Sequence, residues 1–146
     1  MAMAIEEALG YNFSNKNLLK RALTRKAYAN EQKQHNQDCE DQEVYRILGD
    51  AVLKLVLVDR LIASGCGTRE DITLKKKELE REEKLAEIGR NLGIGHAIIL
   101  GIGEKKQKAN EEPKVLAETL EALIAAIYLD GGFDASRETI SKWFKI

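Results

Sequence analysis

The sequence predicts an all-α fold, because its features favour helices and none favours a sheet. The chain of 146 residues holds a single proline, Pro113, so long helices can run without interruption. Apolar residues recur three and four positions apart in several segments. No useful length of chain alternates apolar and polar residues as a strand would. The length suits one hydrophobic core, so we expect residues 1–146 to form a single domain.

The composition limits the classes of function that the sequence supports. Charged residues make up 32% of the chain but cancel to a net charge of −1, so binding to nucleic acid would depend on local basic patches or on metal ions. Cys39 and Cys66 fit no metal or redox spacing, and we interpret them as free thiols in a reducing cytoplasm. The sequence does not begin like a signal peptide, and no segment approaches the ~18 consecutive apolar residues of a membrane span. We therefore expect a soluble cytoplasmic protein with no membrane partner.

Three segments organise the first half of the chain. Residues 14–24 predict a helix, because Ser14 can cap its start and an apolar stripe follows at helical spacing. Residues 29–42 are polar and aperiodic, so we interpret them as a loop. Residues 43–62 predict the next helix, which runs into an almost continuous aliphatic stretch and ends near Gly65.

The second half predicts three further helices. Residues 68–93 form one long, highly charged helical pattern, and Thr68 can cap its start. Residues 93–112 are punctuated by glycines and contain one short apolar run. Residues 113–130 predict a helix with proline in its first turn and a pair of glycines at its end, and residues 134–144 predict the last helix.

The helix predicted at 113–130 carries two acids in an otherwise apolar sequence. From Val115 to Leu129, apolar residues occupy nearly every angular position, as in a helix that is buried on most sides. Glu118 and Glu121 are three residues apart and therefore project from the same face. Two such carboxylates resist ionising together, so either they lie at an exposed edge, or a cation lies between them, or one is protonated.

The helix predicted at 43–62 presents charges in the same manner. Glu43, Arg46 and Asp50 are spaced three and four residues apart, which places them on one helical face. Four acids from two apolar helices could therefore converge on a divalent metal, and carboxylate ligands suit Mg²⁺ or Mn²⁺. A di-iron helical bundle is excluded, because neither His35 nor His96 lies three residues after one of these glutamates.

Four segments resemble the ribonuclease III domain, in the order and with the separations of that family. The stretch LGYNFSNKNLLKRALTRKAYANE resembles the opening of the domain. LGDAVLKLVLVDRLI resembles its signature helix, usually written E-R-L-E-F-L-G-D-A before an apolar run. ITLKKKELEREEKLAEIGRNLGI resembles its middle helix, and GEKKQKANEEPKVLAETLEALIAAIYLDGG its second catalytic helix. The resemblance extends from about Leu9 to Phe144.

The resemblance implies which residues form the catalytic site. The first signature glutamate of the family falls on Glu43, and the aspartate after Leu-Gly falls on Asp50. The acids of the second catalytic helix fall on Glu118, where the family has aspartate, and on Glu121. All four are implied catalytic residues, and Asp50, Glu118 and Glu121 are the implied metal ligands. A further glutamate ligand of the family is replaced by Arg46, which we expect to lie within reach of Glu118 or Glu121 when no metal is bound.

The resemblance also implies the function. It implies a metal-dependent endoribonuclease that acts in RNA processing as a homodimer and cleaves double-stranded RNA with Mg²⁺ or Mn²⁺. The double-stranded-RNA-binding domain that usually follows is absent from the sequence, so we expect a compact member of the family unless the sequence is a piece of a longer protein. The alternative is a degenerate dimer that binds or scaffolds RNA without cleaving it, because Arg46 places a permanent positive charge where a metal ligand is expected. We favour cleavage, because four acids remain.

Two further patterns concern binding partners. The excess of apolar positions in 51–62 indicates either a helix covered by its own core and by a partner chain, or a central core helix. The basic runs could contact phosphates of an RNA duplex through Lys75, Lys76, Lys105 and Lys106. Both runs are flanked by glutamates, so a solvated charged face is the other interpretation.

Overall fold

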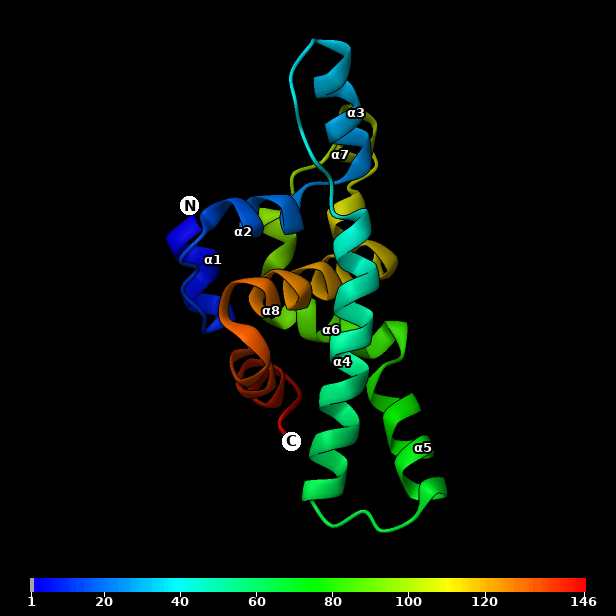
Figure 1. Cartoon of the computed structure of the whole chain (residues 1–146). Coiled ribbons are helices and arrows are strands. Elements are labelled where there is room, and N and C mark those ends of the chain that lie inside the picture. The colour runs from blue at the N-terminus through cyan, green and yellow to red at the C-terminus, as the bar shows by residue number, and fades with distance from the viewer. Residues whose placement is uncertain (1) are drawn as a thin grey trace.

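The computed structural model describes residues 2–146 and confirms the predicted all-α class over that range. Its elements are α1 (Ala2–Leu9), α2 (Lys16–Leu23), α3 (Lys26–Gln34), α4 (Glu43–Ala63), α5 (Arg69–Leu79), α6 (Glu82–Asn91), the 3₁₀ helix η1 (Ile94–Ala97), α7 (Ile102–Lys106), the 3₁₀ helix η2 (Ala109–Glu111) and α8 (Pro113–Phe144) (Figure 1). An isolated parallel bridge between Thr24 and Ile99 joins the segment after α2 to the segment after η1. No helix in the described part of the chain is long and apolar enough to cross a membrane.

The fold is built around the crossing of α4 and α8 (Figure 1). The first half of α8 is buried on nearly all sides, as its sequence predicts, and α2 and α6 also pack against it. One face of α4 packs on α8 through side chains that include Leu53, Val56 and Leu57, none of which is exposed. The opposite face of α4 is apolar and exposed. Its most exposed side chains are Val44 (62% exposed), Ile47 (76%), Leu55 (57%) and Ile62 (58%).

The predicted loop over 29–42 is wrong for its first six residues. Lys26 to Gln34 form α3, although this sequence is polar on most sides. Ala29 is the residue that α3 buries completely, and the Glu31 carboxylate accepts a hydrogen bond from the backbone N–H of Ile102 at 2.8 Å. A helix with so small an apolar face depends on contacts with a distant segment, and the local pattern does not contain them.

The single helix predicted over 68–93 is two helices. α5 ends at Leu79, the backbone becomes extended at Arg81, and α6 begins at Glu82. The physical reason is that the two halves pack on different partners, since α5 lies against α4 whereas α6 buries Leu85 and Ile88 in the core beside α8.

The helix ends follow local signals at most positions. The Thr68 side chain caps α5 by accepting from the N–H of Asp71 at 3.2 Å, as predicted. α2 is capped by Asn15 rather than by the predicted Ser14, because the Asn15 side chain accepts from the N–H of Asn17 at 3.0 Å. Gly65 follows α4 with a φ of +100°, and Gly132 with a φ of +85° breaks α8 between its two predicted helical parts.

Candidate active site

The site lies where α4 and α8 touch through their backbones. Gly49 on α4 faces the backbone of Glu121 on α8, and a Cβ atom on Gly49 would overlap the Glu121 carbonyl group. Glycine is therefore the residue that permits this close approach. The contact places Asp50, the next residue of α4, beside the side chain of Glu121.

Asp50 and Glu121 form one half of the site, which we call the carboxyl pair. Burial raises the pKa of Glu121 to about 8, and the hydrogen bond and charge of Asp50 act in the same direction. Burial also opposes ionisation of Asp50, but hydrogen bonds from Lys54 and Glu121 bring its pKa below the usual value. Glu121 is thus protonated near neutral pH, and its O–H group donates a hydrogen bond to the Asp50 carboxylate. The sequence left three arrangements open for Glu118 and Glu121: an exposed edge, a cation between them, or protonation of one acid. Glu121 is the protonated one.

A chain of charges extends the carboxyl pair toward α5. The Lys54 ammonium lies 2.9 Å from Asp50 Oδ1 and 3.6 Å from Glu80 Oε2. The Lys76 ammonium lies 3.1 Å from Glu80 Oε1, and its charge also favours ionised Asp50. Neither Lys54 nor Glu80 was among the site residues predicted from the sequence. Lys54 follows Asp50 by four residues, a spacing at which a lysine and an acid form an ion pair along one helix. Glu80 is the C-cap residue of α5, just before the break to α6, and the sequence did not predict that break.

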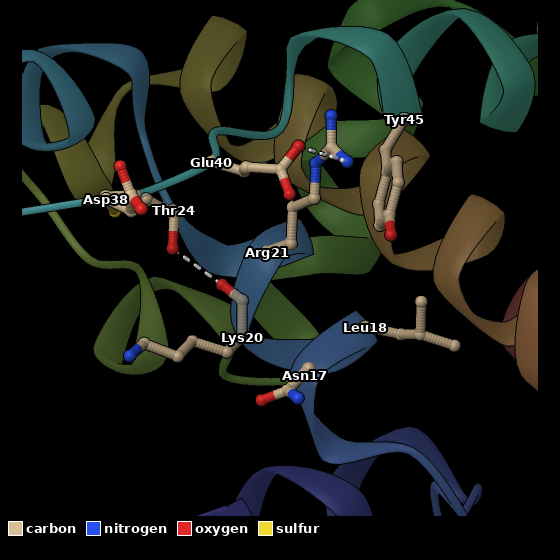
Figure 2. Close-up of a pocket in the computed structure, with 9 residues that line it drawn as sticks. Asn17, Leu18, Lys20, Arg21, Thr24, Asp38, Glu40 and Tyr45 are labelled. Carbon is tan, nitrogen blue, oxygen red and sulfur yellow. Dashed lines mark hydrogen bonds and ion pairs between the residues drawn. The ribbon is translucent and has the colours of Figure 1, made fainter.

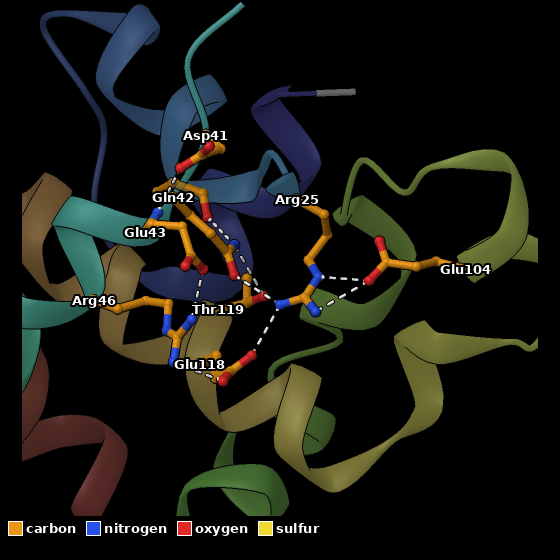
Figure 3. Close-up of polar contacts among 9 residues, drawn as sticks. Arg25, Asp41, Gln42, Glu43, Arg46, Glu104, Glu118 and Thr119 are labelled. Atoms are coloured by element: carbon orange, nitrogen blue, oxygen red, sulfur yellow. Dashed lines mark hydrogen bonds and ion pairs between the residues drawn. The ribbon is translucent and has the colours of Figure 1, made fainter. Parts of the chain in front are cut away.

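Glu118 belongs to the other half of the site, where two arginines hold it. Arg25 Nη1 lies 3.0 Å from Glu118 Oε1, and Arg46 Nη2 lies 2.6 Å from Glu118 Oε2 (Figure 3). Arg46 also pairs with Glu43 at 2.6 Å, and Arg25 pairs with Glu104 of α7 at 3.0 Å. The expected contact between Arg46 and Glu118 is confirmed. The five side chains alternate in sign along one chain of ion pairs, which we call the arginine chain: Glu104, Arg25, Glu118, Arg46 and Glu43.

A buried amide supports the arginine chain. Gln42, the N-cap residue of α4, has no exposed surface, and its Oε1 accepts from Arg25 Nη1 at 3.1 Å (Figure 3). Its Nε2 donates to the carbonyl of Ala22 at 2.8 Å and to Thr119 Oγ1 at 3.2 Å. Arg25 and Gln42 were not among the site residues predicted from the sequence. Arg25 lies within the LTRKAYANE stretch that resembles the family, which was the available signal.

The four predicted acids lie in one region but do not share one cation. Arg46 links Glu43 to Glu118. Its positive charge also acts on Glu121, where it partly offsets the rise in pKa that burial and Asp50 cause, so the two halves are neighbours. Within residues 2–146, no group of three or more acidic, histidine or cysteine side chains is arranged to hold a metal ion. The predicted ligand set of Asp50, Glu118 and Glu121 is therefore not assembled in this state, and the roles of these residues stay predictions.

The carboxyl pair nevertheless fits a divalent cation by its chemistry. Two carboxyl groups that share a proton offer oxygen donors, and a cation can take the place of that proton. Mg²⁺ commonly binds through one or two carboxylates and completes its shell with water and substrate phosphate. Asp50 and Glu121 are the residues that would hold it. Both oxygens of Asp50 accept from the single ammonium of Lys54, at 2.9 and 3.0 Å, whereas the two oxygens of Glu118 are engaged by two different arginines.

The raised pKa of Glu121 predicts a pH-dependent stability in metal-free protein. Folded Glu121 has a pKa of about 8 against an ordinary value of 4.5, so the folded state binds this proton more tightly than the unfolded state does. The stabilising contribution is complete below the ordinary value and is lost as pH rises through about 8. Glu121→Gln keeps a hydrogen-bond donor but cannot titrate, so its free energy of unfolding should fall less with rising pH. Denaturant melts in EDTA between about pH 5 and about pH 9 measure this difference, and equal slopes for the two proteins would contradict the assignment.

The predicted RNA-contact lysines occupy two different surfaces. Lys105 and Lys106 are exposed in the last turn of α7. Lys75 is exposed on α5 with its ammonium 3.4 Å from Cys66 Sγ, whereas Lys76 is half-buried and engaged by Glu80. Nothing in the site tests a contact with RNA, so these contacts stay predictions.

A separate surface cavity lies outside the acid site. It has a volume of about 370 Å³ and is lined by residues of α2, of the segment before α4 and of α4 itself (Figure 2). Arg21 lies beside it, with its guanidinium carbon 4.6 Å from the centre of the Tyr45 ring and an ion pair to Glu40 at 3.0 Å. None of the four predicted acids lines this cavity.

Comparisons with known sequences relate the chain to ribonucleases. A family model described as Ribonuclease-III-like matches residues 15–145. The Ribonuclease 3 of Pseudothermotoga lettingae is 38% identical over 140 residues, which cover 94% of this chain and 59% of that protein. The Ribonuclease 3 of Alkalilimnicola ehrlichii is 37% identical over 143 residues, which cover 97% of this chain and 59% of that protein. The chain therefore spans less than two thirds of the length of these curated relatives.

Comparisons with solved structures agree. A nuclease domain of ribonuclease III from Campylobacter jejuni, described with structural flexibility in a region involved in dimer formation, superimposes with a TM-score of 0.84 and 32% identity over 98% of both chains. Another crystal structure of that nuclease domain, at 2.2 Å resolution, gives a TM-score of 0.84 and 30% identity over 98% of this chain and 92% of that one.

Proposed function

The chain belongs to the ribonuclease III family, and on that premise we propose that it is a metal-dependent endoribonuclease that cleaves double-stranded RNA in RNA processing. The observation that carries the proposal is the carboxyl pair at the α4–α8 crossing, where Asp50 and Glu121 are held together at the cost of a strongly raised pKa of Glu121. Perturbed carboxyls of this kind cluster at functional sites. A cytoplasmic location accords with this role.

The proposed catalytic residues are Glu43, Asp50, Glu118 and Glu121. A bound Mg²⁺ or Mn²⁺ would supply an activated water and positive charge at the phosphodiester that is cut. Asp50 and Glu121 would hold the ion, and Lys54 orients the Asp50 carboxylate through its 2.9 Å contact. Glu118 is the further ligand that the sequence resemblance to the family implies. Lys75 and Lys105 are candidates for phosphate contacts away from the cut.

We also propose that two copies associate through the exposed apolar face of α4. Four large apolar side chains on one side of a single helix are more than an isolated surface commonly exposes. A second copy of the same face would bury them by two-fold symmetry.

The dimer proposal predicts a defined effect of Leu55→Asp. Leu55 is 57% exposed, so the change should leave the core intact but place a charge in the interface. Light scattering should then report 16.4 kDa, whereas the parent should have twice that mass. Ile102→Asp, which alters a 63% exposed side chain on α7, is the matched control and should remain dimeric.

The second candidate function is RNA binding without cleavage, and the arginine chain is the observation that favours it. Arg46 neutralises Glu118 at 2.6 Å, so a resident guanidinium occupies an oxygen that the family would offer to metal. A protein of this kind would bind duplex RNA and leave it intact.

An RNA cleavage assay separates the two functions. The purified protein is incubated with a long RNA duplex in Mg²⁺, in Mn²⁺ and in EDTA, with single-stranded RNA and duplex DNA of equal length as controls. We expect the RNA duplex to be cut into short products with either metal and to remain whole in EDTA. Duplex RNA that is bound in a gel-shift assay yet stays whole with both metals would replace the proposed enzyme by the binding protein.

A further inference from the structure

Glu118 is saturated by two cations of the chain itself. Each of its carboxylate oxygens accepts from a different guanidinium, Arg25 at 3.0 Å and Arg46 at 2.6 Å, and its side chain is 12% exposed. Each oxygen of this carboxylate faces a positive guanidinium, which repels a divalent ion at the same oxygen. Glu118 can bind a cation together with Asp50 and Glu121 only if its ion pair with at least one arginine is broken.

Both arginines can retain partners if Glu118 leaves. Arg25 still has the Glu104 carboxylate and the Gln42 amide oxygen, and Arg46 still has Glu43. Arg46 Nε is buried and has no hydrogen-bond partner among the described residues, so this guanidinium has donor capacity left over. Arg25 is anchored by its backbone, whose N–H donates to the carbonyl of Ile99 at 3.0 Å.

Phosphate is the anion that best competes with a carboxylate for such groups. A guanidinium presents a planar fork of donors that matches two oxygens of a phosphodiester, and two neighbouring forks double this match. Glu118, once displaced, lies three residues before Glu121 on the same face of α8, so it is placed to add a carboxylate to the carboxyl pair.

We propose that Arg25 and Arg46 are phosphate-binding groups that pair with Glu118 until a phosphodiester replaces it. A bound phosphodiester and a bound divalent cation then each increase the affinity of the protein for the other. This inference rests on the proposed function, because it takes the carboxyl pair as the cation site. The phosphate frees Glu118 for the cation, and the cation, by holding Glu118, frees the arginines for the phosphate. Coupling of this kind is reciprocal by thermodynamic necessity.

Calorimetric titration with Mg²⁺ tests the coupling without any cleavage. The intact protein is titrated in inorganic phosphate buffer and in chloride buffer of equal pH and ionic strength. We expect the dissociation constant for Mg²⁺ to be lower in phosphate by about tenfold. Arg25→Gln and Arg46→Gln should each lose most of this difference and should bind Mg²⁺ more tightly than the parent in chloride, because one oxygen of Glu118 is then free.

Two controls make the result specific. Arg69→Gln removes an arginine that is 91% exposed and should keep the full difference between buffers. Some Mg²⁺ binds to free phosphate in the buffer, which lowers the free Mg²⁺ concentration equally for every variant. A comparison among the variants therefore removes this effect. If Arg25→Gln fails to fold, Arg25→Lys retains the charge without the fork and should still reduce the coupling.

The outcomes distinguish the inference from the function on which it rests. Equal Mg²⁺ affinity of the parent in both buffers overturns the inference and leaves the carboxyl pair as a cation site. An equal response of Arg25→Gln and the parent to phosphate also overturns it. Absence of Mg²⁺ binding in both buffers overturns the cation site and the inference together.

Discussion

Gly49→Ala is expected to unfold most of the protein or to lower its free energy of unfolding by about 3 kcal/mol or more, since overpacking at a rigid contact has nowhere to relax. The added methyl group would overlap the carbonyl group of Glu121, and both atoms of that group belong to the backbone of the central helix. Neither α4 nor α8 can move without opening the core between them. Denaturant melts followed by circular dichroism measure the loss.

Gly103→Ala is the matched control for this substitution. Gly103 lies in α7, and a Cβ atom added there meets nothing within 4 Å. Its replacement should leave stability unchanged or raise it slightly, because alanine reduces the freedom of the unfolded chain. If Gly49→Ala melted like Gly103→Ala, the helices would cross elsewhere, and the position of the carboxyl pair would be wrong.

Glu121→Gln is expected to reduce cleavage of duplex RNA by more than about a hundredfold, because loss of even a residue that only orients a metal ligand costs 10–100-fold. The variant keeps the shape of the side chain and its hydrogen bond to Asp50 but removes the charge that would hold a cation. Rates of RNA cleavage in excess Mg²⁺ measure the effect. Circular dichroism melts show whether the fold is retained.

Glu83→Gln serves as the control for cleavage. Glu83 is exposed on α6 and has no part in either half of the site, so its variant should cut at the parental rate. Full cleavage by Glu121→Gln would show that the chemistry resides elsewhere in the chain.

The sequence predicted what depends on short-range patterns. Thr68 caps α5 and Gly65 follows α4, as expected, because caps and left-handed turns depend on residues within a few positions. The buried character of the first half of α8 was likewise visible from its composition. The predicted contact of Arg46 with Glu118 came from combining two helical faces with the family resemblance.

What the sequence did not predict depends on residues far apart in the chain. Arg25 reaches Glu104 and Glu118, which lie 79 and 93 positions further on, and no spacing rule connects them. The division of the four acids into two halves has the same origin, because Glu118 pairs with Arg25 and Arg46 whereas Glu121 pairs with Asp50. The break between α5 and α6 follows from packing against two different helices.

The position of a bound metal tests the central claim most directly. A crystal of the protein soaked in Mn²⁺ without phosphate, measured at a wavelength where manganese scatters anomalously, locates the ion without assumptions about activity. We expect one anomalous peak within ligand distance of the carboxylates of Asp50 and Glu121. A crystal that gives no peak at this pair at saturating Mn²⁺ would contradict the account of the site.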